Sequence, residues 1–309
     1  MKVLKCSHCG GSIDLNKYNY QLASCPYCGN TIVVHAEDLG IDKTTGGMIK
    51  QMYGGKAVGE FISNKLYEAN EDEAWKTNAH HITFAGMNDD IELAYRQIIT
   101  DGNVSMYVCR ENVALLFKDK ETADAYVKNV RVLKYPTDDS KSLRSYMPTV
   151  TNIFVLKDGQ VLVIIDRGSR EYPLSNYMNM PHVHAAWVMS RLENICCLLQ
   201  YSGISIKDLR IEDLFVDVHN HQICMYGAFW RMEKKEDTEQ LKKIREIVKS
   251  LMNIKIENKD FNDEPIPDAF YEFLTDEPKK DAFEDFQYWD TSLMLSYGNR
   301  TFVKYDEEY

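Results

Sequence analysis

The chain has 309 residues, of which 44% are hydrophobic and 11% aromatic. This composition is sufficient for at least one hydrophobic core and excludes a chain that is disordered throughout. The formal net charge of −11 disfavours a protein that binds nucleic acid over its whole surface, because such binding relies on Lys and Arg displacing counterions from phosphates.

The distribution of apolar residues predicts a cytoplasmic protein without membrane contact. No stretch reaches the roughly 20 apolar residues that a bilayer span requires, and residues 1–5 lack the apolar region of a signal peptide. Thiols stay reduced in the cytoplasm, so we interpret the eight Cys as metal ligands and core residues and not as disulfides.

Four of these Cys form two C-x-x-C units near the N-terminus. Cys6 and Cys9 make the first unit, and Cys25 and Cys28 make the second after 15 intervening residues. This spacing is typical of a zinc ribbon in which four thiolates hold one structural zinc ion. We therefore predict a zinc ribbon over residues 1–36.

The residues around the two units predict short strands at 12–15, 20–23 and 31–34, where apolar and polar residues alternate. So short a segment has little apolar surface to bury, and metal binding would supply about 10 kcal/mol or more of folding free energy. The alternatives are a redox dithiol and four unrelated buried Cys.

Four protein ligands leave no open position on the zinc ion, so the ribbon is predicted to be structural and not catalytic. The negative charge of a four-thiolate site offsets the nearby Lys residues. We therefore expect the ribbon to contact a protein, through Tyr18, Tyr20 and Tyr27, and regard nucleic-acid binding by the ribbon as an alternative.

Residues 37–99 are predicted to be a linker and a helical connecting segment. The linker carries Gly40, Gly46 and Gly47 among polar residues. Apolar residues then recur at helical spacing over 57–67, which predicts one amphipathic helix.

From residue 100 onwards the pattern predicts strands followed by helices. Strands are expected at 104–109, 113–117, 152–156 and 161–165, the last two joined by Asp158-Gly159, and a helix at 121–132. Further helices are expected at 181–199, 239–252, 268–274 and 289–297. Cys196 and Cys197 fall within the first of these and are interpreted as core residues.

This α+β order and two motifs resemble the protein kinase family. Residues 206–217, with the sequence Ile-Lys-Asp-Leu-Arg-Ile-Glu-Asp-Leu-Phe-Val-Asp, resemble the kinase catalytic loop and the strand after it. The resemblance places Asp208 at the catalytic aspartate. Residues 113–118 are similar to the strand that carries the ATP-binding lysine, which places Lys118 in that role.

Several kinase residues are absent from this sequence. The region similar to D-F-G reads Met-Tyr-Gly-Ala-Phe over 225–229 and has no metal-binding carboxylate. Asp213 stands where the loop's metal-binding Asn is expected, and Lys128 and Asn129 stand where the helix should offer a Glu to Lys118. No G-x-G-x-x-G precedes residue 113. Metal neutralisation and phosphate positioning, on which this reaction depends, would both be weakened.

The resemblance therefore implies a degenerate kinase-like protein, or pseudokinase, of a kind found in bacteria and their phages. The implied fold is a two-lobed domain over 100–309, with a small lobe at about 100–170 and a large lobe at about 171–309. The implied function is binding to another protein without catalysis.

Two other interpretations remain open. One is an unorthodox ATP-dependent kinase or nucleotidyl transferase that uses magnesium together with Asp208, Asp213 and Lys118. The other is an unrelated α+β domain in which Asp208 and Asp213 are solvated loop carboxylates.

Overall fold

The computed structural model describes residues 75–298, except 136–140, 142, 207, 218–220, 234–237, 255–259 and 262–263, together with four short strands before residue 34. The chain divides into two units, Met1–Ala79 and His80–Tyr309.

The first unit contains two pairs of antiparallel strands. β1 (Val3–Lys5) pairs with β2 (Ser12–Asp14), and β3 (Leu22–Ser24) pairs with β4 (Thr31–Val33). The strand expected at 20–23 is therefore centred slightly later, and the other two agree closely with the prediction. The predicted zinc ligands Cys6, Cys9, Cys25 and Cys28, and the helix expected at 57–67, lie outside the described residues.

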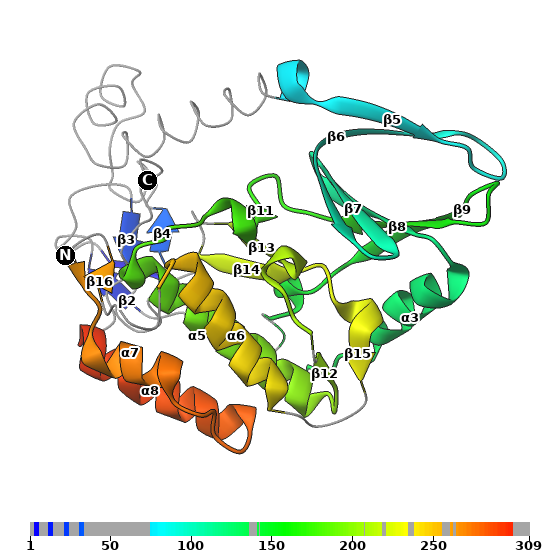
Figure 1. The fold of residues 1–309 in the computed structure, drawn as a ribbon. Helices are drawn as coiled ribbons and strands as arrows, with labels where there is room; N and C mark the ends of the chain where they lie inside the picture. Colours follow the sequence, from blue (N-terminus) through cyan, green and yellow to red (C-terminus); the bar gives the residue numbers. More distant parts are fainter. Residues whose placement is uncertain are drawn as a thin grey trace, which may run out of the picture. The chain divides into compact units, whose positions relative to one another are not determined.

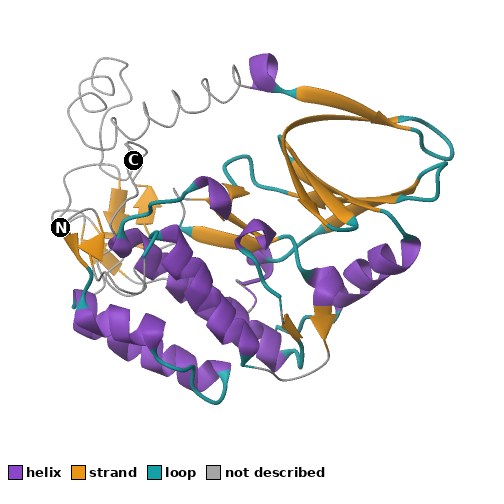
Figure 2. Ribbon diagram, viewed as in Figure 1, coloured by secondary structure: helices purple, strands orange, loops and turns teal. Residues whose placement is uncertain are grey.

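The second unit begins with a six-stranded antiparallel sheet of order β5-β6-β7-β8-β10-β9 (Figures 1 and 2). The strands are β5 (His80–Phe84), β6 (Ile91–Asp101), β7 (Val104–Cys109), β8 (Asn112–Phe117), β9 (Val150–Val155) and β10 (Val161–Asp166). The sheet thus starts at His80, before the predicted start of the domain at residue 100, because β5 and β6 were assigned to the connecting segment.

The sheet curls so that its two ends approach each other (Figure 1). Gly86, just after β5, forms a bridge with Leu156 beyond β9, and the Lys157 N–H donates to the Ala85 carbonyl at 2.9 Å. The concave face encloses a small core that includes Tyr107, Leu162 and Ile164. Curling therefore buries a second face that an open sheet would leave in water.

The opposite face of the same strands packs on the helices. Successive side chains of a strand point to opposite faces, so Val113, Leu115 and Phe117 of β8 enter the main core while Ala114 enters the small one. Helix α3 (Lys120–Arg131) follows β8, and Asp119 caps its N-terminus by accepting from the Thr122 N–H at 2.7 Å. The 3-10 helix η2 (Leu143–Tyr146) precedes β9.

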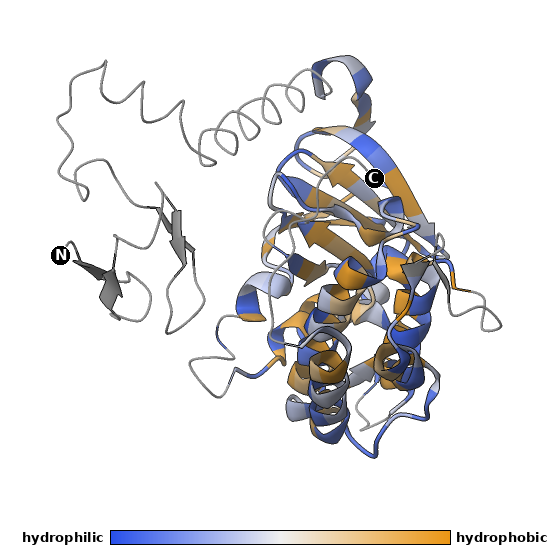
Figure 3. Ribbon diagram, turned by 90° about the vertical axis from the view of Figure 1, so that its left-hand side faces the viewer, coloured by the Kyte–Doolittle hydropathy of each residue, from blue (hydrophilic) through white to orange (hydrophobic). Residues whose placement is uncertain are grey.

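The rest of the unit is mostly helical. α5 (His182–Tyr201) packs against α6 (Glu239–Leu251) and α8 (Ala282–Tyr297), and α7 (Asp268–Thr275) packs against α8 (Figure 1). Hydrophobic residues run through the sheet and these helices (Figure 3). No helix among the described residues has the length and apolarity of a membrane span.

Short elements connect the sheet to the helices and connect the helices to one another. They are β11 (Tyr172–Pro173), η3 (Leu174–Asn176), β12 (Ser205–Ile206), η4 (Ile211–Asp213), β13 (Leu214–Asp217), β14 (Gln222–Met225), η5 (Phe229–Arg231), β15 (Met232–Glu233), β16 (Asp260–Phe261) and β17 (Glu264–Pro265). β11, β13 and β14 form one small sheet, and β12 pairs with β15. The predicted α+β class is thus observed, with the sheet before the helices.

Candidate functional site

Asp208 and Asp213 lie on either side of Arg210, in the segment between β12 and β13. Asp213 ends the 3-10 helix η4 and is buried, whereas the Asp208 side chain is 53% exposed. One oxygen of Asp213, Oδ2, accepts from the Arg210 backbone N–H at 2.9 Å. The local turn therefore fixes Asp213 inward and leaves Asp208 at the surface.

Two arginines connect these carboxylates to a third one, Asp101, at the end of β6. Arg210 donates from Nη1 to Asp101 Oδ1 at 2.6 Å and from Nε to Asp208 Oδ2 at 3.0 Å. Arg231, from η5, binds Asp101 Oδ2 through Nη1 and Asp213 Oδ2 through Nη2. We call these five residues, Asp101, Asp208, Arg210, Asp213 and Arg231, the charged cluster.

The charged cluster carries three carboxylates and two guanidinium groups, a formal charge of −1. Burial raises the pKa of Asp213 to about 6, although the Arg231 guanidinium opposes this shift. The hydrogen bond from Arg210 lowers the pKa of Asp208. Each carboxylate therefore already has a cationic partner supplied by the chain.

Gly227 is required by its close approach to Asp213. The N–H groups of Tyr226 and Gly227 both donate to the Asp213 carbonyl at 3.0 Å. A Cβ atom at Gly227 would lie 2.2 Å from Asp213 Oδ1. Only glycine allows the backbone this near the carboxylate.

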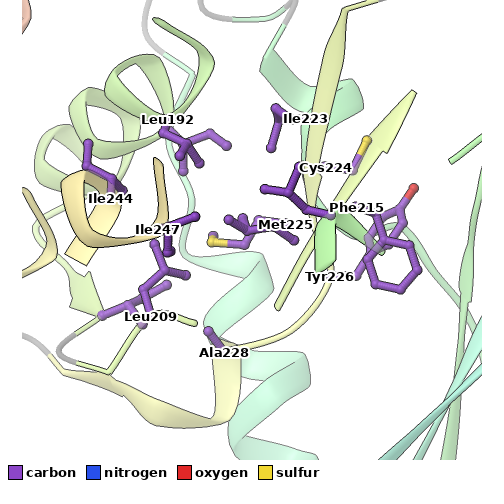
Figure 4. Close-up of a cluster of buried hydrophobic side chains, with 14 of the residues drawn as sticks. Leu192, Leu209, Phe215, Ile223, Cys224, Met225, Tyr226, Ala228, Ile244 and Ile247 are labelled. Carbon is purple, nitrogen blue, oxygen red and sulfur yellow. The ribbon is translucent and has the colours of Figure 1, made fainter. Parts of the chain in front are cut away.

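The segment similar to D-F-G is packed into the core. Met225 is fully buried, and Figure 4 shows it among apolar side chains that include Leu209 and Ile247. The Tyr226 hydroxyl binds a Glu171 carboxylate oxygen. The position at which the kinase resemblance expects the metal-binding Asp of D-F-G is thus occupied by a thioether side chain in an apolar environment.

Helix α3 contacts the backbone of this segment directly. The Tyr126 hydroxyl donates to the Tyr226 carbonyl at 2.9 Å, and Asn129 Nδ2 donates to the Phe229 carbonyl at 2.8 Å. Aromatic contacts join Tyr126 to Phe117 and Trp230, with ring centroids 5.5 and 6.0 Å apart. Asn129 therefore anchors η5, at the place where the kinase resemblance expects a Glu paired with a lysine.

Lys118 lies beside the charged cluster without bonding to its carboxylates. Its side chain is exposed, and its Nζ donates to the Gly102 carbonyl at 3.1 Å, one residue beyond Asp101. The preceding residue, Phe117, is the one that points into the main core. The structure therefore connects Asp208 and Asp213 through Arg231 Nη2, which donates to the Asp208 backbone carbonyl at 3.1 Å and to the Asp213 carboxylate, and it places Lys118 next to the β6–β7 connection.

Three members of the charged cluster, Asp101, Arg210 and Arg231, were not predicted from the sequence. Asp101 ends β6 and precedes Gly102. An acidic residue followed by glycine is the only feature of the neighbouring sequence that sets Asp101 apart. Arg210 lies inside the loop that resembles the kinase motif, and its place between Asp208 and Asp213 is the sequence feature that indicates an ion pair there.

No group of three or more Cys, His, Asp or Glu side chains within the described residues is arranged to hold a metal ion. Cys196 lies in the main core as predicted, and Cys197 is partly buried against that core. Burial raises the pKa of both thiols, that of Cys197 to about 12. Neither thiol is an activated nucleophile.

The comparisons with known proteins found similarity to solved structures. No protein-family model matches the sequence, and no curated protein matches it. Among solved structures, a co-crystal of WbdD with a kinase inhibitor has a TM-score of 0.45 and 12% identity, covering 66% of this chain and 46% of WbdD. Vaccinia related kinase 3 has a TM-score of 0.47 and 11% identity, covering 69% of this chain and 90% of that protein.

The bifunctional kinase-methyltransferase WbdD, in another structure, has a TM-score of 0.46 and 12% identity over 70% of this chain. This chain spans about half the length of the WbdD structures that it matches, 46% in one and 49% in another. At these values the likeness concerns fold alone, so the chemistry of the site is inferred from this chain's own residues.

Proposed function

We propose that the second unit is a degenerate kinase-like domain that does not transfer phosphate and acts by binding another protein. The observation that carries this proposal is the charged cluster, in which Arg210 and Arg231 already pair with Asp208 and Asp213. These two carboxylates are the residues that the kinase resemblance assigns to catalysis and metal binding.

Electrostatics supports the loss of phosphoryl transfer. The reaction needs metal ions that neutralise the phosphates and carboxylates that hold those ions. Here Asp213 is buried against Arg231, so a metal ion would have to displace a hydrogen-bonded guanidinium. Met225 offers no oxygen ligand at the other expected position.

Packing supports the same conclusion. Tyr126 and Asn129 of α3 hold the backbone of residues 226–229 by side-chain hydrogen bonds. In an active kinase the corresponding helix supplies a carboxylate that pairs with the ATP-binding lysine, and this ion pair must be in place for phosphate transfer. Lys118 is instead bonded to a backbone carbonyl in this chain.

For the first unit we propose one structural zinc ion held by Cys6, Cys9, Cys25 and Cys28. The strand pairs support this proposal, because the residues between β1 and β2 include Cys6 and Cys9, and those between β3 and β4 include Cys25 and Cys28. Each C-x-x-C unit is thus flanked by paired strands. Such a site, closed by four thiolates, would stabilise a docking module.

Nucleotide binding tests the proposed inactivity. We expect no change in melting temperature with millimolar ATP and either Mg²⁺ or Mn²⁺, and no transfer of labelled γ-phosphate, because a bound ligand must stabilise the folded state. A shift together with phosphate transfer that Asp208→Ala abolishes would instead support the unorthodox kinase or nucleotidyl transferase.

Partner binding tests the interaction role. Proteins that co-purify with the full chain from its native cell should be the same for wild type and Asp208→Ala. Cys25→Ser should remove the zinc measured by mass spectrometry and lose the partners that the ribbon contacts. Retention on nucleic acid that falls with salt would favour the alternative of a nucleic-acid-binding ribbon.

A further inference from the structure

Strand β9 keeps one of its two edges free for most of its length. It is the last strand of the six-stranded sheet and pairs with β10 on one side (Figure 1). On the other side the Val155 carbonyl accepts from the Met87 N–H at 3.3 Å, and within the described residues no backbone hydrogen bond joins 150–154 to a strand there. Because peptide groups alternate in direction along a strand, those of Ile153 face the same side as the Val155 carbonyl. β9 therefore offers unpaired peptide groups to a further strand.

The side chains along this edge are apolar and exposed. Ile153 is 48% exposed and Val155 is 47% exposed. Ile153 lies opposite Val163 of β10, a residue of the main core, so its side chain is on the face of the sheet against which α3 packs. Proteins usually protect an edge strand with charged side chains, Pro or a covering element. An edge that exposes Ile and Val is typical of a surface that binds another chain.

Two hollows lie along the outer side of α3, and both are lined by Val127 and Arg131. The first has a volume of about 480 Å³ and lies between α3 and Ile153. The second has a volume of about 420 Å³ and lies between the C-terminal end of α3 and residues 144–150, which lead into β9. Binding cavities in proteins typically have volumes of about 300–1,000 Å³. A strand added to β9 would therefore find room for its side chains on the α3 side of the sheet.

Unpaired cations line both hollows. Lys128 lines the first, Arg144 lines the second and Arg131 lines both, and Asp124 is the one carboxylate among the lining residues. Within the described residues these three cations form no ion pair, in contrast to the two arginines of the charged cluster. The whole chain has a formal charge of −11. A local excess of cations on an acidic chain favours a partner of negative charge.

We propose that the free edge of β9 binds an extended, acidic segment of another protein by strand addition. Three side chains of the segment, at alternate positions, face α3: two apolar ones enter the two hollows, and a carboxylate between them pairs with Arg131. A second copy of this chain fits less well, because symmetric pairing of two β9 strands would bring like cations together. The proposal rests on the proposed function, since it gives the interaction role a surface and a class of partner.

Titration of a labelled peptide with the full chain, followed by fluorescence anisotropy, tests the proposal. The capped peptide Thr-Val-Thr-Glu-Thr-Val-Thr presents both valines and the glutamate on one face of a strand. The matched peptide Thr-Val-Glu-Thr-Thr-Val-Thr has the same composition but places the glutamate on the opposite face. We expect the first peptide to bind about fivefold more tightly, the ratio that one partly exposed ion pair provides.

Variants of the chain assign this preference to the surface beside α3. Arg131→Gln should remove it, so that the two peptides bind alike. The matched control Lys249→Gln removes the same charge from α6, which packs on α5 and α7, and should retain the preference. Ile153→Thr should weaken the first peptide about fivefold, whereas Ile98→Thr, at an exposed site on β6, should bind as the wild type does. Circular dichroism checks that each variant is folded.

Backbone pairing has a readout of its own. N-methylation of the nitrogens of the first peptide removes its donors and should abolish binding, and hydrogen exchange at the Ile153 N–H, measured by NMR, should slow when the unmodified peptide binds. Equal binding of the two peptides by the wild type, or unchanged exchange at Ile153, would overturn the proposal. So would a dimer of the chain alone that Ile153→Lys dissociates, because the edge would then belong to a second copy.

The proposed function and this surface fail separately. Phosphate transfer by the wild type with ATP and Mg²⁺ would defeat the proposed function, while the comparison of the two peptides would still decide whether β9 accepts an acidic strand.

Discussion

The second unit contains two arginine–carboxylate networks that differ in burial. The charged cluster lies at the end of β6 and includes the half-exposed Asp208. The second, which we call the interior network, consists of Arg245 of α6, Asp285 of α8 and Glu193 of α5, and all three side chains are buried. The same residue types therefore occur in water-accessible and in dry surroundings.

The interior network is held by hydrogen bonds that are shielded from water. Arg245 Nη2 donates to both Asp285 oxygens, at 2.7 and 2.9 Å, and Asp285 Oδ1 also accepts from the Lys279 N–H at 2.8 Å. Burial and the nearby Asp285 carboxylate raise the pKa of Glu193 well above its ordinary value. The buried Arg245–Asp285 pair therefore links α6 to α8 inside the core.

The largest effect is expected from removing the interior guanidinium. Arg245→Met leaves the buried Asp285 without its cation, which should lower the free energy of unfolding by about 3–5 kcal/mol. Urea denaturation measures the loss. The matched control is Lys242→Met on the same helix, whose partner Glu277 is exposed, and a loss no larger than that of the control would contradict the comparison.

A smaller loss is expected in the charged cluster. Arg231→Gln removes the cationic partner of the buried Asp213 and should lower the free energy of unfolding by about 2 kcal/mol at neutral pH. Arg210→Gln, whose own side chain is 40% exposed, should cost less. Equal losses for the two variants would show that burial does not distinguish these ion pairs.

The dependence of the free energy of unfolding on pH should report the titration of Asp213. Its pKa rises from 3.8 to about 6 on folding, so the folded state binds more protons than the unfolded state between these values. The free energy of unfolding contributed by Asp213 therefore falls as pH rises through this interval and stays low above it. Asp213→Asn should remove this fall in denaturation curves recorded across the interval.

Asp208 provides the control of opposite sign. Its lowered pKa means that the unfolded state binds the proton more readily, so any stability it contributes is lost as pH falls through the folded pKa. Asp208→Asn should leave the fall assigned to Asp213 unchanged. A fall that persists in Asp213→Asn and disappears in Asp208→Asn would reverse the assignment.

The smallest effect is expected from Glu193→Gln. An amide has the shape of a carboxyl group and is neutral, the form that the raised pKa of Glu193 favours, so the change at neutral pH should stay below about 1 kcal/mol. Thermal melts of the two proteins measure the difference. A stabilisation of several kcal/mol would instead indicate that Glu193 is ionised in the wild type.

The residues 80–101 illustrate why part of the fold was missed. Ile91, Leu93 and Tyr95 alternate with other residues, a pattern typical of a strand. The register of β6 against β7 then shifts between Tyr95 and Gln97, so the alternation changes phase within one strand. A search for one continuous alternation of apolar and polar residues therefore does not identify the whole of β6.

Local sequence determined the elements whose signal lies in neighbouring residues. The strand 104–109 was predicted with its observed bounds. The helix predicted at 121–132 differs from α3 by one residue at each end, and the helix predicted at 239–252 differs from α6 by one residue at its C-terminal end. The motif resemblance also placed Asp208 and Asp213 in one loop. These features depend on side-chain periodicity and on contacts over a few residues.

Only the tertiary structure decided which charges neutralise each other. Asp101 is separated from Arg210 by 109 positions and from Arg231 by 130, and no local pattern relates residues so far apart. The fold places the end of β6 beside Arg210 and Arg231 and so brings them together. Because the free energy of an ion pair depends on distance and burial, the sequence supplied the charges, and the fold determined that Asp101, Asp208 and Asp213 are paired with arginines.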